Sequence, residues 1–176
     1  RRHPVGREVG GDVGARLAHM DELGIEVQVL YPTLFLRPYT NKRQTERALC
    51  QSYNRWLAAI WKQGRERLRW VAAPPLLSMD TVRDELEFAK DNGACGIFMR
   101  GLECERRLSD PQFYPLYECA SDLDLAVCLH SGNNSFAVND LYRDDLSFMR
   151  FKFQVVGACH ALLMEGLPER FPEVSW

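Results

Sequence analysis

The chain has 176 residues, of which 46% are hydrophobic and 26% charged, a composition typical of a folded protein with a sizeable core and not of a disordered one. A formal net charge of -2 leaves no basic surplus for nucleic acid and no acidic tail. Small molecules or other proteins are therefore the expected partners.

The six cysteines are scattered without any C-x-x-C pair, and most lie in apolar periodic segments, where free cysteine behaves as a small hydrophobic residue. This usage indicates a reducing, cytoplasmic setting. No segment approaches the roughly 20 apolar residues of a membrane-spanning helix, so no membrane contact is expected. The polar start at Arg1 lacks the apolar core of a signal peptide, although the absence of an initiating methionine leaves a removed leader open.

The first part of the chain alternates helix and strand patterns. Apolar residues at helical spacing predict helices over 12–24 and 41–64, with Asp12 and Asn41 as capping residues. The segment 25–31 is rich in β-branched and apolar residues and is followed by proline, so it predicts a strand.

The alternation continues toward the C-terminus. Further strands are predicted at 68–73, 94–99 and within 125–132, separated by helices near 80–92 and 110–123. Residues 171–176 resemble the approach to a fifth strand. Before them, a long helix is predicted from about 140 to 165, with its buried face formed by Phe148, Phe151, Val155, Cys159 and Leu162.

Strands alternating with amphipathic helices indicate β-α-β units and a parallel sheet, so the predicted fold class is α/β. An eight-stranded barrel needs about 250 residues, and this chain supplies four whole strands and a stub. We therefore expect a single (β/α)8, TIM-barrel-like domain over 1–176 that is incomplete, with about strands 2 to 6 present. Its open strand edges predict a partner, either the missing barrel segments or a second copy in a homo-oligomer.

Two residues end predicted strands on the side where parallel sheets carry their chemistry. His130 ends the fourth strand and is the main candidate for a catalytic or metal-binding residue, with a hydrogen-bonded structural histidine as the alternative. Arg100 ends the third strand, where its guanidinium could hold a substrate carboxylate with two hydrogen bonds or remain a surface arginine.

Four neighbouring polar residues are weaker candidates for substrate binding. Ser131, Asn133 and Asn134 follow His130 and could donate to a substrate, but Ser-Gly-Asn-Asn is equally a turn-forming sequence. Tyr31 ends the first strand and could line the mouth of a barrel, although an aromatic residue in that position often only packs.

Four segments of the sequence resemble the metal-dependent amidohydrolase-related family, in the branch of the aminocarboxymuconate-semialdehyde decarboxylase-like proteins. They occur in collinear order and span nearly the whole chain. These segments are RLAHMDELGIEVQVLYPT at 16–33, PQFYPLYE at 111–118, VCLHSG at 127–132 and GLPERFP at 166–172.

The resemblance implies a distorted (β/α)8 barrel that holds one divalent metal through a His-x-His pair, a histidine on a middle strand and a late aspartate. Only His130 matches this set, because His3 has no partner at i+2 and the late aspartate would lie downstream of Trp176. His19 and His160 lie within helical segments and are predicted to be structural. Zinc is the expected metal, with manganese or magnesium as alternatives, and we expect it to be poorly bound or absent in this chain alone.

The resemblance therefore predicts that the parent protein is a metal-dependent hydrolase or a non-oxidative decarboxylase acting on a small carboxylate-bearing or lactone-like substrate. The alternative is a non-catalytic, truncated or degenerate barrel that serves binding or oligomerisation. Metal content and the presence of a His-x-His pair upstream distinguish the two.

Overall fold

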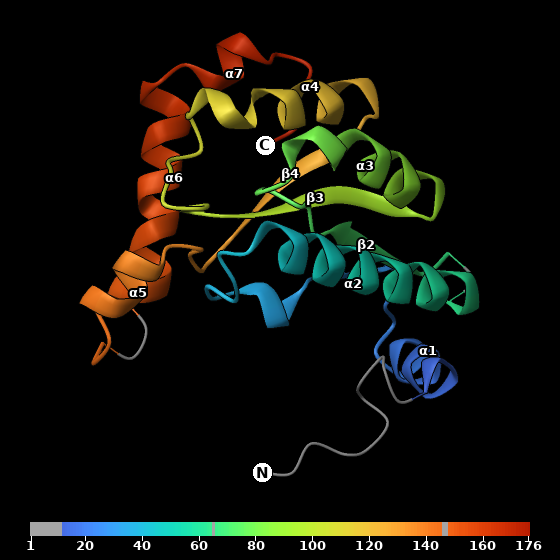
Figure 1. Ribbon diagram of the computed structural model, residues 1–176. Coiled ribbons are helices and arrows are strands. Elements are labelled where there is room, and N and C mark those ends of the chain that lie inside the picture. The colour runs from blue at the N-terminus through green and yellow to red at the C-terminus, as the bar shows by residue number, and fades with distance from the viewer. Residues whose placement is uncertain (1–11, 65, 146–147) are drawn as a thin grey trace.

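The computed structural model describes residues 12–64, 66–145 and 148–176. Four parallel strands form one sheet in sequential order (Figure 1). The strands are β1 (Gln28–Leu30), β2 (Leu68–Ala72), β3 (Ala94–Arg100) and β4 (Ala126–His130). Helices connect successive strands, so the sheet is half of a (β/α)8 barrel, which confirms the predicted fold class.

Seven α-helices lie in the described part of the chain, and none of them is long and apolar enough to cross a membrane. They are α1 (Val13–Glu22), α2 (Arg43–Gln63), α3 (Val82–Asp91), α4 (Tyr114–Asp122), α5 (Phe136–Leu141), α6 (Phe153–Met164) and α7 (Leu167–Arg170). Short 3-10 turns form at Thr33–Phe35, Met79–Thr81 and Pro111–Phe113, and a π-helical turn at Phe148–Lys152.

One predicted helix cap is confirmed and one is wrong. The carboxylate of Asp12 accepts from the backbone N–H of Ala15 at 3.0 Å, as expected of an N-cap. The second helix begins at Arg43 and not after Asn41, and the residue at its N-cap, Lys42, makes no side-chain capping bond.

The first strand is shorter than the apolar segment 25–31 predicts. Its partner strand, β2, begins at Leu68, which lies opposite Gln28, so the residues before Gln28 have no strand beside them. A strand pattern needs a neighbouring strand before its backbone can form a ladder.

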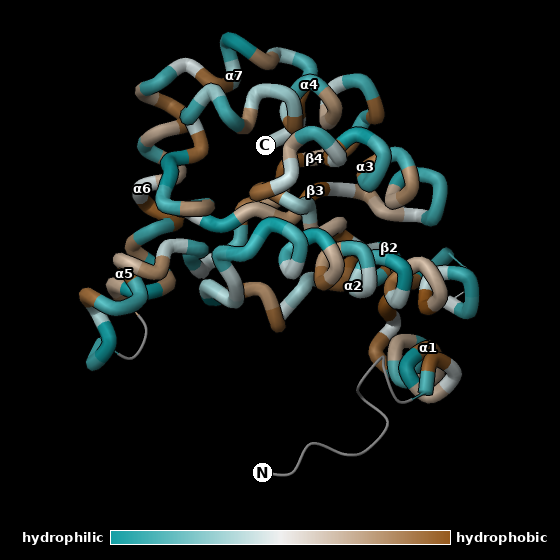
Figure 2. Tube along the Cα trace, in the orientation of Figure 1, coloured by the Kyte–Doolittle hydropathy of each residue, from teal (hydrophilic) through white to brown (hydrophobic). Residues whose placement is uncertain are grey.

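The main core lies between the sheet and α2, α3 and α4, which alternate hydrophobic and hydrophilic residues along their length (Figure 2). The largest of its fully buried side chains, Trp70, donates its indole N–H to the carbonyl of Asn92 at 3.0 Å. Full burial of each large apolar side chain contributes about 1.5–3 kcal/mol. These contacts fix the strands from one side.

A second, smaller cluster covers the opposite face of the sheet. Val71 and Phe98 alternate with core-facing neighbours along their strands and pack instead against Phe35 and Cys50. Phe35 belongs to the segment after β1, which therefore folds over the inner face of the half-barrel.

The predicted helix over 140–165 is broken into α5, the π-helical turn and α6. Its predicted face is right for Leu162, which is buried, and wrong for Phe148 and Cys159, which are exposed. The buried residues of α6 are Gln154, Ala158, Ala161 and Leu162, whereas Val156 is 60% and Leu163 75% exposed. Apolar residues surround this helix, so their spacing could not single out one face.

Two contacts place the C-terminal segments against the sheet. The helices α5 and α6 lie at the end where the strands finish (Figure 1), and a Cβ on Gly101 would meet the Gln154 carbonyl oxygen at 2.1 Å. The backbone N–H of Val127 in β4 donates to the Ser175 carbonyl at 2.7 Å. The described residues form no fifth strand, but the chain approaches β4 where one would begin.

Candidate functional site

The structure brings Arg100 and His130 together at the carboxyl ends of β3 and β4. They are the last register partners of the two strands. Barrels of this type carry their active sites at this end of the strands, so the backbone places both residues where the sequence predicted.

His130 is half-buried, and its Nδ1 is hydrogen-bonded to Ser131. Its Nδ1 lies 2.8 Å from the carbonyl oxygen of Ser131, which can only accept, so this hydrogen bond requires the neutral ring to carry its proton on Nδ1. The ring centroid lies 5.5 Å from that of Tyr31 and 6.0 Å from that of Phe98. This arrangement leaves Nε2 with its lone pair and with no hydrogen-bond partner among the described residues, which is the form that binds metals.

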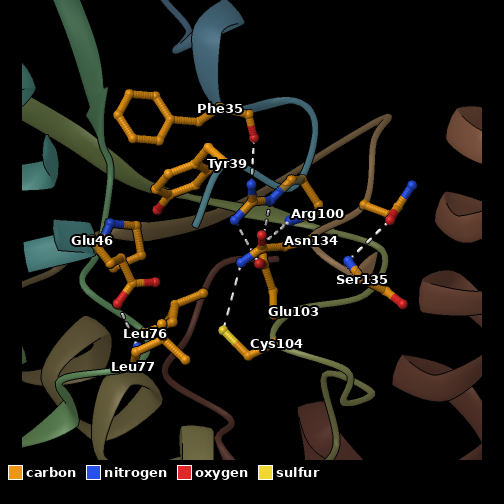
Figure 3. A network of polar contacts seen from close by, with 12 residues as sticks. Phe35, Tyr39, Glu46, Leu76, Leu77, Arg100, Glu103, Cys104, Asn134 and Ser135 are labelled. Carbon is orange, nitrogen blue, oxygen red and sulfur yellow. Dashed lines mark hydrogen bonds and ion pairs between the residues drawn. The ribbon is translucent and has the colours of Figure 1, made fainter. Parts of the chain in front are cut away.

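Arg100 is engaged in a buried ion pair with Glu103 (Figure 3). Only 3% of Arg100 and none of Glu103 is exposed. The Glu103 carboxylate accepts from the backbone N–H, Nε and Nη2 of Arg100 at 2.7, 2.9 and 2.6 Å, and Nη1 donates to the Phe35 carbonyl. Burial alone lowers the pKa of Arg100, but the charge and hydrogen bonds of Glu103 outweigh it and raise that pKa.

The substrate-clamp role of Arg100 therefore stays a prediction that this geometry does not support. Each guanidinium nitrogen already donates within the protein. The alternative of a surface arginine is wrong, because the side chain is buried.

The two asparagines after His130 are buried, and their side chains make hydrogen bonds within and around the turn. The side chain of Asn133 donates to the Arg150 carbonyl and accepts from the backbone N–H of Ser135. Asn134 donates to the Cys104 sulfur at 3.5 Å, and its buried Oδ1 has no hydrogen-bond partner in the part of the chain that the structure describes. A substrate-binding role for Asn133 is a prediction that these contacts do not test.

The other two candidates remain accessible. Ser131 is half-buried, and its hydroxyl lies 3.4 Å from the Nδ1 of His130. Tyr31 is 39% exposed and faces His130. Partial burial and a hydrogen bond with Cys128 raise the pKa of Tyr31 to about 12, so its phenol stays neutral and can donate.

An extra residue interrupts the pairing of the two strands directly after His130. The last ladder pair is Arg100 with His130, and the next pair is Glu103 with Asn134, so three residues on one side face two on the other. Gly132 within this bulged turn has φ +138°, and a Cβ there would lie 2.6 Å from the Leu36 carbonyl oxygen. Bulges beside active sites redirect side chains.

A buried carboxyl group that the sequence analysis did not single out lies beside the ion pair. Glu46, in the first turn of α2, is 1% exposed and accepts from the backbone N–H of Leu77 at 2.6 Å. Burial, opposed by this hydrogen bond and reinforced by the charge of Glu103, raises the pKa of Glu46 to about 7.

The raised pKa of Glu46 predicts that the stability of the fold depends on pH. This pKa rises from 4.5 to about 7 on folding, so the free energy of unfolding should fall as the pH rises through this interval. The shift corresponds to on the order of 3 kcal/mol. We expect Glu46→Gln to gain this stability relative to the unmodified chain between about pH 5 and about pH 8, as measured by urea unfolding. The exposed Glu87→Gln is the control, and equal pH profiles for the Glu46 variant and the unmodified chain would refute the assignment.

The described residues do not make up a metal site by themselves. They contain no group of three or more His, Cys, Asp or Glu side chains able to hold an ion. His19 lies near Arg16 on α1, His160 is exposed on α6, and His3 lies outside the described residues. One imidazole does not fit a divalent metal alone, since a catalytic zinc site uses three protein ligands.

Four parallel strands in sequential order, with polar residues gathered at their carboxyl ends, define an α/β-barrel protein of which half is present. The chain belongs to the Amidohydro_2 family, whose model, described as Amidohydrolase, matches residues 3–176. The predicted family resemblance is thereby confirmed.

Solved structures with the same fold include several decarboxylases. The 5-carboxyvanillate decarboxylase of Sphingomonas paucimobilis has a TM-score of 0.78 at 20% identity, with 93% of this chain and 50% of that one covered. The 2,6-dihydroxybenzoate decarboxylase of Rhizobium has a TM-score of 0.73 at 24% identity, with 90% of this chain and 53% of that one covered. The 5-carboxyvanillate decarboxylase of Novosphingobium aromaticivorans was solved with manganese and 4-hydroxy-3-methoxy-5-nitrobenzoic acid. It has a TM-score of 0.75 at 19% identity, with 93% of this chain and 48% of that one covered. This chain spans about half the length of each of these structures.

Proposed function

We propose that the protein containing this half-barrel is a non-oxidative carboxy-lyase that acts on a small aromatic or unsaturated carboxylic acid. In such a reaction the bond between the carboxylate group and the substrate carbon that bears it breaks. Carbon dioxide leaves, and that substrate carbon takes up a proton. His130 would be one ligand of a divalent metal, manganese or zinc, whose other ligands would come from outside residues 1–176. Tyr31 and Ser131 would contact the substrate.

The observation that carries this proposal is the state of His130. The bond from Nδ1 to the Ser131 carbonyl orients the ring and leaves Nε2 free, as a neighbouring carbonyl does for metal-binding histidines. Tyr31 is 39% exposed beside the ring, and its aromatic face suits a flat substrate. The likeness to decarboxylases of aromatic carboxylates favours this reaction over hydrolysis of a lactone-like substrate.

The test uses the full-length gene product that carries this chain. Its metal content would be measured by elemental analysis, and a panel of hydroxylated benzoic acids and small lactones would be assayed by absorbance and carbon dioxide release. We expect about one manganese or zinc per chain and carbon dioxide release from at least one benzoic acid. Hydrolysis of lactones without carbon dioxide release from any benzoic acid would show that the protein is a hydrolase and not a lyase. Turnover of neither class without stoichiometric metal would favour the non-catalytic alternative.

A further inference from the structure

We propose that Arg100 and Glu103 are positioning residues for His130. Their buried ion pair fixes residues 32–37, which follow Tyr31, and the bulged turn 131–133, which follows His130. The pair thereby keeps the proton of His130 on Nδ1 and the lone pair on Nε2. The inference rests on the proposed function only in assigning His130 to the site.

The ion pair first makes the end of β3 rigid. Glu103 accepts three hydrogen bonds, all from Arg100, and one of them comes from its backbone N–H. The last residue of β3 is thus fixed through main chain and side chain together. Because Arg100 is the register partner of His130, the adjacent strand end is fixed as well.

The backbone on either side of Glu103 anchors the turn that follows His130. Glu103 forms a parallel bridge with Asn134, and the backbone N–H of Asn134 donates to the Leu102 carbonyl at 2.8 Å. The carbonyl of Asn134 accepts from the N–H of Cys104 at 3.1 Å. Strand-like pairing therefore resumes beyond the bulge, so the turn is held at both of its ends.

The pair also reaches the segment 32–37, which in turn contacts the bulged turn. The Nη1 of Arg100 donates to the Phe35 carbonyl, and the Leu36 carbonyl accepts from the backbone N–H of Asn133 at 3.3 Å. This segment continues directly from Tyr31, whose ring faces the imidazole at 5.5 Å.

These contacts determine the tautomer because the acceptor of the Nδ1 proton is itself part of the turn. The Ser131 carbonyl can accept this proton only while the turn keeps its orientation. An imidazole released from that carbonyl is free to carry its proton on either nitrogen. The inference is therefore that the hydrogen-bonded ion pair at the end of β3 selects the tautomer of the histidine at the end of β4.

The tautomer can be measured in the metal-free chain by long-range proton–nitrogen NMR of its histidines at an alkaline pH, with His130→Gln to assign the signal. We expect the unmodified chain to show His130 protonated on Nδ1. Glu103→Gln, which keeps the shape and removes the charge, should replace this pattern by the average of both tautomers. Glu87→Gln, in an exposed ion pair of α3, is the matched control and should leave the pattern unchanged.

An unchanged Nδ1 pattern in a folded Glu103→Gln variant would overturn the inference, as would an unmodified chain protonated on Nε2. If circular dichroism shows that Glu103→Gln does not fold, Arg100→Lys replaces it with the same expected result. Lysine keeps the positive charge but lacks the guanidinium that donates to Glu103 and to the Phe35 carbonyl together. In an active full-length protein we expect the folded variant to lose about tenfold or more in kcat with KM nearly unchanged. The NMR result stands whether or not the proposed activity is found.

Discussion

Substituting His130 by glutamine in the full-length protein is expected to lower kcat/KM for its substrate by at least about a hundredfold. Loss of a residue that merely orients a metal ligand costs about 10- to 100-fold in affinity or activity, so loss of the ligand itself should cost at least as much. Metal content should fall in parallel. The measurement is steady-state kinetics together with elemental analysis of the purified variant.

The fold should tolerate this substitution, which separates a functional effect from a structural one. Within the described part of the chain, the His130 ring hydrogen-bonds only through Nδ1, to the carbonyl and hydroxyl of Ser131. Loss of such a bond costs about 0.5–1.5 kcal/mol of unfolding free energy. His160→Gln is the matched control, because that histidine is exposed on α6. A His130 variant with activity within a few-fold of the unmodified protein would remove His130 from the site.

The sequence was sufficient to predict the α/β class and the position of His130 because both depend on local patterns. Short apolar runs followed by turn residues identify parallel strands, and a polar residue at the end of such a run must lie at the carboxyl edge of the sheet. The register of β3 and β4, which makes Arg100 the neighbour of His130, follows from two such runs that end at equivalent points.

The roles of Arg100 and Glu46 were not predictable because they depend on contacts between loops. Glu103 lies in a segment without periodicity, so its pairing with Arg100 has no signature in the sequence. Glu46 lies in the first turn of a helix, where an acidic residue is ordinarily a solvated partner of the helix dipole. Its burial under Leu77 is a consequence of how the loop after β2 folds back. The buried face of α6 was predicted only in part, with Leu162 right and Cys159 wrong, because apolar residues occur on most sides of that helix.

The buried ion pair should also be the largest single polar contribution to the stability of this chain. Arg100→Met leaves the Glu103 carboxylate buried with one remaining donor, the backbone N–H of residue 100. Removing one partner of a buried pair costs about 3–5 kcal/mol, a large share of the roughly 5–15 kcal/mol that stabilises a typical domain. We expect a loss of this size in urea unfolding.

Two further variants identify the cause of that loss. Arg100→Met combined with Glu103→Leu removes both charges, and it should recover part of the stability because an apolar pair carries no desolvation cost. Arg107→Met, which breaks an exposed ion pair with Glu165, should cost less than about 1 kcal/mol. If the double variant is no more stable than Arg100→Met alone, the loss comes from the packing of the arginine stem and from the unpaired Phe35 carbonyl. In that case the charge of Glu103 holds neither the segment 32–37 nor the turn after His130.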